Sequence, residues 1–107
     1  MGDGAVGLRR EGHGDGLEHA VALGARALLE QVLALRRRVL GDEHPDTLIS
    51  MNNLAATLYA QGETDRAVAL VAEALPVALR KYGPKPEVSQ YLIGWAEKLG
   101  VPIPPLL

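Results

Sequence analysis

Residues 33–62, LALRRRVLGDEHPDTLISMNNLAATLYAQG, contain two helical patterns separated by a turn. The pattern returns 42 residues later without a gap, so that Leu40-Gly41 recurs as Tyr82-Gly83. Other pairs at the same offset are Leu28 and Leu70, Leu33 and Leu75, Leu35 and Val77, and Arg38 and Arg80. A two-helix repeat of this length is typical of a helical solenoid, a fold that usually assembles partners and rarely performs chemistry.

Three short motifs and four apolar positions define the repeat in more detail. They are LGDEHPDT at 40–47, MNNLA at 51–55, LYAQG at 58–62, and then Ala67, Leu70, Ala74 and Leu75. Together they resemble the tetratricopeptide repeat, in the longer-period form found in kinesin light chains and many bacterial signalling proteins. The resemblance implies an all-α fold, a right-handed array of helical hairpins forming an α-solenoid. It also implies a non-enzymatic protein–protein interaction module.

Helical spacing and turn residues predict about four helices. The first is expected over residues 17–40 and ends at Gly41, because glycine tolerates the left-handed conformation after a last turn. Its predicted apolar stripe is Leu17, Val21, Leu28, Val32, Leu35 and Val39, and Ala20, Ala25 and Leu29 widen it. Gly24 lies inside this helix and is expected to allow a neighbouring helix to approach closely. The other three helices are predicted over 46–60, 63–82 and 86–99. Pro45 stands at the start of the first of these three, a position that suits proline.

The ends of the chain and one internal proline depart from this pattern. Residues 1–16 contain six glycines and are expected to be a flexible leader, and residues 101–107 are expected to be a proline-stiffened, extended tail. The helical domain is therefore predicted over 17–100. Pro76 falls inside the third helix, where it removes a hydrogen bond and clashes with the carbonyl of Ala72. It predicts either a kink or a helix that ends early and restarts.

Bulk composition excludes several classes of protein. The 107 residues suit one small domain, and the absence of Phe requires a core of Leu, Val and Ala. A net charge of −2 argues against nucleic-acid binding, and the absence of cysteine excludes disulfides and thiolate chemistry and fits a reducing compartment. No apolar run is long enough to span a membrane, and no secretory signal is evident. A soluble cytoplasmic protein is expected, and the composition suits a GC-rich bacterial genome.

The second predicted helix carries the candidate binding residues. Ile49, Asn52, Ala56 and Tyr59 form a stripe displaced from its core stripe. The resemblance implies that this helix lines a concave groove for a partner's peptide or helix, in which asparagines hydrogen-bond the peptide backbone. Asn52 is favoured for contact, and Asn53 lies at the flank. The alternatives are that one of the asparagines bonds a neighbouring helix, and that Tyr59 covers the adjacent helix.

A rival hypothesis is that the chain is a homo-oligomerisation or scaffold unit. A short array leaves open ends near residues 28–39 and 92–99, which could bury themselves against another copy as a homodimer. The candidate self-association residues are Leu92, Trp95 and Leu99. For Trp95, the alternative is that it fills the core between the third and fourth helices.

Charged and titratable clusters give weaker indications. The run Arg36-Arg37-Arg38, with Arg80 and Lys81 one repeat later, could form a basic ridge that attracts acidic peptides, although most such runs are solvated faces.

The histidines do not predict chemistry. His44 stands beside Asp46, but a turn and helix start are the stronger interpretation, and no nucleophile with an oriented partner is evident. His13, Asp15 and His19 lack a third strong ligand at a defined spacing. No catalytic residue, metal or cofactor is therefore expected.

Overall fold

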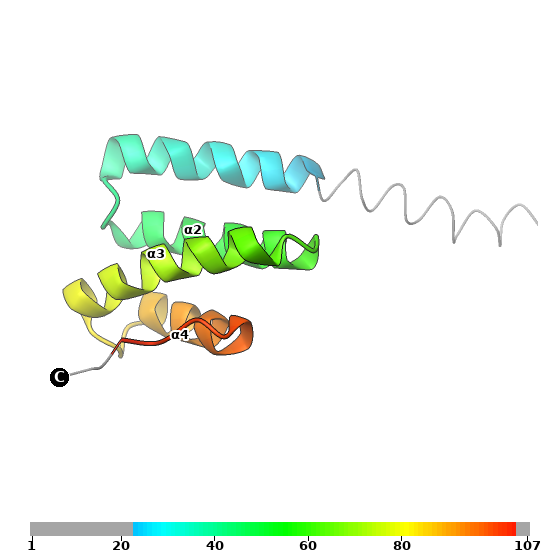
Figure 1. The fold of residues 1–107 in the computed structure, drawn as a ribbon. Coiled ribbons are helices and arrows are strands. Elements are labelled where there is room, and N and C mark those ends of the chain that lie inside the picture. The colour runs from blue at the N-terminus through cyan, green and yellow to red at the C-terminus, as the bar shows by residue number, and fades with distance from the viewer. Residues whose placement is uncertain (1–22, 105–107) are drawn as a thin grey trace, which may run out of the picture.

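The computed structural model describes residues 23–104, and within them the chain is an all-α array of helical hairpins, as predicted (Figure 1). The first helix is described over residues 23–40. It is followed by α2 (Pro45–Ala60), α3 (Thr64–Tyr82) and α4 (Glu87–Leu99). The bounds of these three labelled helices lie within one residue of the predicted ranges. The proposed leader, 1–16, and the last part of the proposed tail, 105–107, lie outside the described residues.

Local chemistry sets the turn between the first helix and α2. Gly41 has a φ of +95°, a conformation that side-chain-bearing residues rarely adopt, and its N–H donates to the carbonyls of Arg36 and Arg37. The backbone N–H of Asp46 donates to His44 Nδ1 at 3.0 Å, so His44 is the N-cap of α2. Pro45 occupies the first helical position, where a missing N–H costs nothing.

The second turn has the same kind of glycine signal. Gly62 has a φ of +84°, and the N–H of Glu63 donates to the carbonyl of Leu58 at 2.8 Å. The same carbonyl also accepts from the N–H of Gln61 at 3.1 Å, so two donors of the turn pair with the last turn of α2. The close turn sets α3 against α2.

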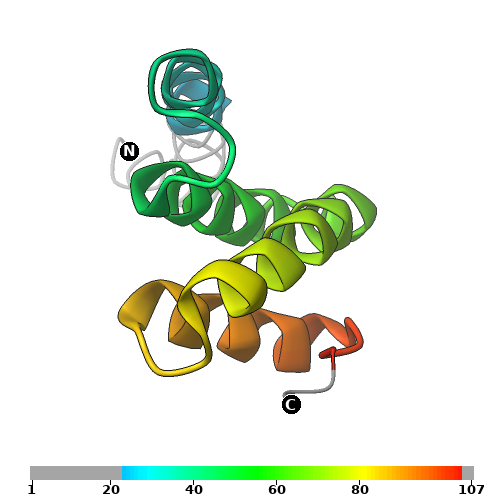
Figure 2. The same ribbon diagram turned by 90° about the vertical axis from the view of Figure 1, so that its left-hand side faces the viewer.

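Aliphatic side chains from α2, α3 and α4 form the core, which these three helices close by packing against one another (Figure 2). The largest side chains that are fully buried are those of Leu48, Met51, Leu58, Leu75, Leu92, Val71, Thr47 and Ser89. Alanines such as Ala55 and Ala74 are fully buried too, and their small side chains allow the helices to approach closely. Val101, just after α4, is 8% exposed and closes one end of this core.

The first helix joins the core by a different face from the one predicted. Leu33 is buried, and Leu29, which was expected at the edge of the stripe, packs against the core, whereas the described residues along the centre of the predicted stripe point outward. These exposed residues are Leu28, Val32, Leu35 and Val39, and the remaining two, Leu17 and Val21, lie outside the described residues. The prediction was wrong because helical spacing identified an apolar face but not the face that α2 and α3 cover.

Two helix-breaking residues behave differently from expectation. The helix α3 continues from Thr64 to Tyr82 through Pro76, so the predicted early end is wrong. Ala72, whose carbonyl loses its partner, is exposed, and water can therefore bond that carbonyl. Gly24 is exposed, and a Cβ added there would meet nothing within 4 Å, so no close helix approach depends on it.

Candidate functional site

The exposed face of α2 is a stripe of four residues between its contacts with the first helix and with α4. Ile49, Asn53, Ala56 and Ala60 follow one another at intervals of three or four residues and are therefore surface neighbours. Asn53 and Ala60 are exposed, and Ile49 and Ala56 are half-buried beside them. Asn53 thus offers a free carboxamide, one carbonyl acceptor and two N–H donors, in the middle of a shallow apolar strip.

Asn52, which was favoured for ligand contact, lies mostly inside the molecule. It is only 8% exposed, and its Oδ1 is buried without a hydrogen-bond partner. Tyr59, seven residues later on the same side of the helix, contacts α4, so Asn52 faces that helix as well. The buried Oδ1 cannot reach a ligand on the surface, and the exposed asparagine is Asn53.

Two aromatic rings and a lysine form a cluster where α2 meets α4. The rings of Tyr59 and Trp95 meet edge-to-face, with their centroids 5.5 Å apart. The ammonium of Lys98 lies 5.1 Å from the centroid of the tyrosine ring and 5.0 Å from that of the tryptophan ring. Edge-to-face pairs and cations over ring faces are both favourable geometries. Trp95 therefore joins α4 to α2, rather than only filling the space between α3 and α4.

A shallow hollow of about 350 Å³ extends this cluster along α4. It is lined by Gln90, Tyr91, Gly94, Trp95 and Lys98. Gly94 has nothing within 4 Å of its missing Cβ, which leaves room beside the tryptophan. The exposed strip of α2, the aromatic cluster and this hollow are therefore continuous, and we call them the α2–α4 face.

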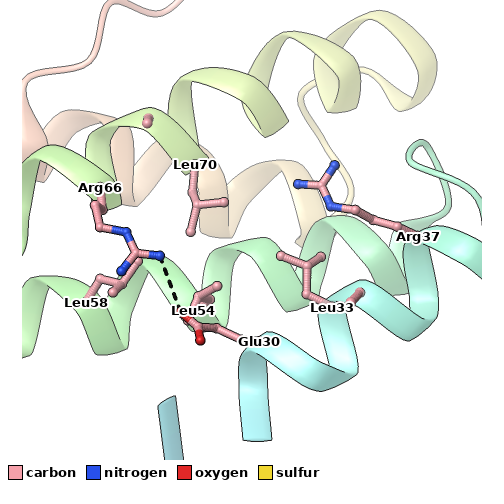
Figure 3. Close-up of a pocket in the computed structure, with 9 residues that line it drawn as sticks. Glu30, Leu33, Arg37, Leu54, Leu58, Arg66 and Leu70 are labelled. Atoms are coloured by element: carbon pink, nitrogen blue, oxygen red, sulfur yellow. Dashed lines mark hydrogen bonds and ion pairs between the residues drawn. The ribbon is translucent and has the colours of Figure 1, made fainter. Parts of the chain in front are cut away.

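A second, larger groove of about 560 Å³ lies between the first helix and α3 (Figure 3). Its floor is made of Leu54 and Leu58 from α2, and its walls carry Ala34, Ala69 and Leu70. The sequence analysis did not predict this groove. The only signal for it was that small residues, Ala34 and Ala69, occur where the two helices face each other, and alanine is too common to be read in this way.

Ion pairs span the rim of this groove. Across the groove, Arg66 pairs with Glu30 at 3.3 Å and Arg37 pairs with Glu73 at 3.0 Å, and Arg37 also pairs with Asp42 of the adjoining turn at 3.3 Å. The hydrogen bond to Glu73 is the main cause that raises the pKa of the Arg37 guanidinium above its ordinary value. The groove is thus an apolar gap between the first helix and α3, and ion pairs between the charged side chains of these two helices bridge it.

The arginine run is used mainly for contacts within the molecule. Arg36 donates to Ser50 Oγ at 2.8 Å and to the carbonyl of Asp46 at 3.1 Å, and these bonds tie the first helix to α2. One repeat later, Arg80 and Lys81 both pair with Glu43, at 3.0 and 3.5 Å. Carboxylates therefore pair with Arg37, Arg80 and Lys81, and Arg36 is engaged by α2, which argues against a continuous basic ridge.

A family model described as Tetratricopeptide repeat matches residues 17–80, more than half of the chain. The chain belongs to the tetratricopeptide repeat family. Comparisons with curated proteins and with solved structures found no match. Tetratricopeptide repeats generally serve as protein–protein interaction modules, and this general class of function applies to the chain.

Within this tetratricopeptide array, the residues considered for self-association are not all at the surface. Leu92 is fully buried in the core, so it cannot contribute to an interface, while Leu99 and Trp95 are half-buried. A charged residue at position 92 would therefore disrupt the fold before it tested an interface.

Two further findings concern chemistry and membranes. Among residues 23–104, no group of three or more His, Asp or Glu side chains is placed to hold a metal ion, and His13, Asp15 and His19 lie outside that range. No helix in the described part of the tetratricopeptide array is both long and apolar enough to cross a membrane.

Proposed function

We propose that the chain binds a short peptide segment of a partner protein across the α2–α4 face, without catalysing a reaction. The observation that carries the proposal is the cluster of Tyr59, Trp95 and Lys98, in which two aromatic rings and a cation meet at the surface between neighbouring helices. Aromatic anchors of this kind dominate the binding energy of many protein interfaces.

Each part of the face has a distinct role in this proposal. The carboxamide of Asn53 matches a peptide group, because it can donate to a backbone carbonyl and accept from a backbone N–H. Ile49 and Ala56 provide apolar contact beside it. Tyr59 and Trp95 flank the next side chain of the peptide.

Lys98 gives the face a preference for negative charge. Its ammonium lies over two rings and has no carboxylate partner among the described residues. The N–H donors that point away from the rings remain available to a peptide carboxylate. We therefore expect the bound segment to combine an acidic residue with an apolar one.

Selection from a displayed random-peptide library provides the test. The chain contains a single tryptophan, so the fluorescence of Trp95 can report the binding of each selected peptide. Replacing Tyr59 or Asn53 by Ala is expected to weaken binding by about 5- to 30-fold, the range of a moderate to strong interface contact. The matched control is Lys85→Ala, an exposed residue in the turn before α4. If Tyr59→Ala and Asn53→Ala both bind the peptides as tightly as Lys85→Ala does, the proposal is refuted.

The groove between the first helix and α3 is a second candidate site for a peptide, because its floor and walls are apolar and its volume would admit one or two side chains. The variant Ala34→Leu fills this groove and leaves the α2–α4 face unchanged. If selected peptides bind this variant normally, the groove is not their site. If the peptides no longer bind Ala34→Leu but still bind Tyr59→Ala, the groove is their binding site and the α2–α4 face is not.

A further inference from the structure

The outer side of the first helix is an apolar surface that nothing within the described chain covers. Leu28 is 63% exposed, Val32 39%, Leu35 50% and Val39 67%. In Figures 1 and 2 this helix lies at the edge of the array, with the other helices on one side of it only. Large aliphatic side chains that gather on one exposed face usually mark an interaction surface.

The spacing of this surface is that of a coiled coil. Ala25, Leu28, Val32, Leu35 and Val39 follow one another at intervals of three, four, three and four residues, which are the a and d positions of a heptad. The a positions hold Ala and the β-branched Val, and both d positions hold Leu. Valine at a with leucine at d favours parallel, two-stranded association. We call these five residues the heptad seam.

The seam faces away from the body of the molecule. At about 100° per residue, the centre of the seam is turned about a third of a revolution from Leu33, the residue that enters the core. A second helix could therefore lie along the seam without displacing α2 or α3.

We propose that the heptad seam binds the seam of a second copy of this chain, and that the two first helices form a short parallel coiled coil. A surface with Val at a and Leu at d is complementary to itself when two copies align in register. The flanking positions fit the same arrangement, since Gln31 at g would lie against Arg36 at e of the other copy, with no pair of like charges. Arg36 is already bonded to α2, so the flanks give no reason to prefer an acidic partner helix.

Residues 1–16 do not match the seam, because they contain six glycines and no heptad pattern. The same register does include Val21 at a d position in the sequence, which lies outside the described residues.

Sedimentation equilibrium of the full chain, from about 10 µM to about 1 mM, tests the proposal, because a seam of little more than two heptads should give a weak dimer. The parent chain is expected to dimerise, and Leu35→Glu is expected to raise the dissociation constant at least about tenfold, as the loss of a central anchor does. Ala27→Glu is the matched control, since it adds the same charge on an exposed position of the same helix outside the seam. Circular dichroism establishes that both variants are folded.

Cross-linking tests the parallel orientation. The chain has no cysteine, so Val39→Cys introduces a single thiol at an a position, where identical residues of a parallel pair face each other. Oxidation is expected to yield a covalent dimer of Val39→Cys and not of the control Ala27→Cys.

Three results would overturn the proposal. The first is a parent chain that stays monomeric throughout the series, which would leave the seam for a different protein. The second is a dimer that persists in Leu35→Glu, and the third is equal cross-linking of the two cysteine variants. The seam lies outside the α2–α4 face, so Leu35→Glu should bind selected peptides as the parent does, and either proposal can fail without the other.

Discussion

His44 caps the helix α2 with its side chain, and this role accounts for the histidine that stands beside Asp46 in the sequence. The imidazole Nδ1 accepts a hydrogen bond from the N–H of Asp46 at 3.0 Å, one of the donors that the start of a helix leaves unpaired. Tyr82 of α3 reaches the same turn, because its hydroxyl donates to the carbonyl of Glu43 at 2.7 Å. The turn is therefore held both by the helix α2 that begins at its end and by α3, which lies further along the chain.

Replacing His44 by Ala is expected to lower the free energy of unfolding by about 1 kcal/mol, because a helix N-cap contributes about that much. Urea denaturation followed by circular dichroism measures the change. His44→Asn is the matched control and should restore most of the loss, since asparagine is a good N-cap. Equal losses in the two variants would show that the imidazole stabilises the turn by contacts other than the cap.

At the scale of the element, α3 is the helix that most contradicts its own local preferences. It carries Pro76 in its interior, which removes the hydrogen bond to the carbonyl of Ala72. The helix is nevertheless continuous, because five of its residues are buried between α2 and α4. Those residues are Ala67, Val71, Ala74, Leu75 and Ala78. Tertiary packing thus overrides the proline.

Pro76→Ala is expected to raise the free energy of unfolding by about 1–3 kcal/mol, because the variant regains a backbone hydrogen bond and loses a steric clash. The gain is smaller than the full penalty of a helical proline, since alanine also makes the unfolded chain more flexible. Thermal and urea denaturation measure it. Leu79→Ala, on the next turn of the same helix, is the opposite control and should destabilise the protein. A loss of stability in Pro76→Ala would mean that the proline ring packs better than the backbone bond it replaces.

At the scale of the whole molecule, the first helix is attached more weakly than the other three. Among its described residues, Leu33 alone is an aliphatic side chain that is buried in the core, and much of the remaining attachment is electrostatic. Arg26 pairs with Glu63, and Arg37 pairs with Glu73. Partly exposed ion pairs of this kind contribute little each, about 0–1 kcal/mol, and are screened by salt.

Hydrogen exchange should show that the first helix opens before the rest of the array. Amides of residues 28–40 are expected to exchange at least about tenfold faster than those of α3, because local opening exposes few apolar contacts. Raising the ionic strength to about 1 M, or replacing Glu73 by Gln, should widen the difference. Uniform protection across all four helices, unaffected by salt, would show that the array unfolds as one unit. The exchange is measured at low protein concentration, so that any self-association does not protect the helix.

The sequence alone determined the helical elements and the family, because their signals are local. Gly41, Gly62 and Gly83 take positive φ angles where helices end, because glycine has no Cβ to oppose them. Pro45 begins α2, because its fixed φ and missing N–H suit the first position of a helix. The 42-residue repeat also lies within the printed chain and needs no tertiary information.

Tertiary structure decided which face of each helix is covered. Periodicity places Asn52 and Asn53 about 100° apart on α2 but does not say where α4 will lie, so the asparagine at the surface could not be identified in advance. For the same reason the apolar stripe of the first helix was expected inside, whereas Leu33, on another face, enters the core. The angles between side chains on one helix follow from its own geometry, but the neighbour that buries a face comes from elsewhere in the chain.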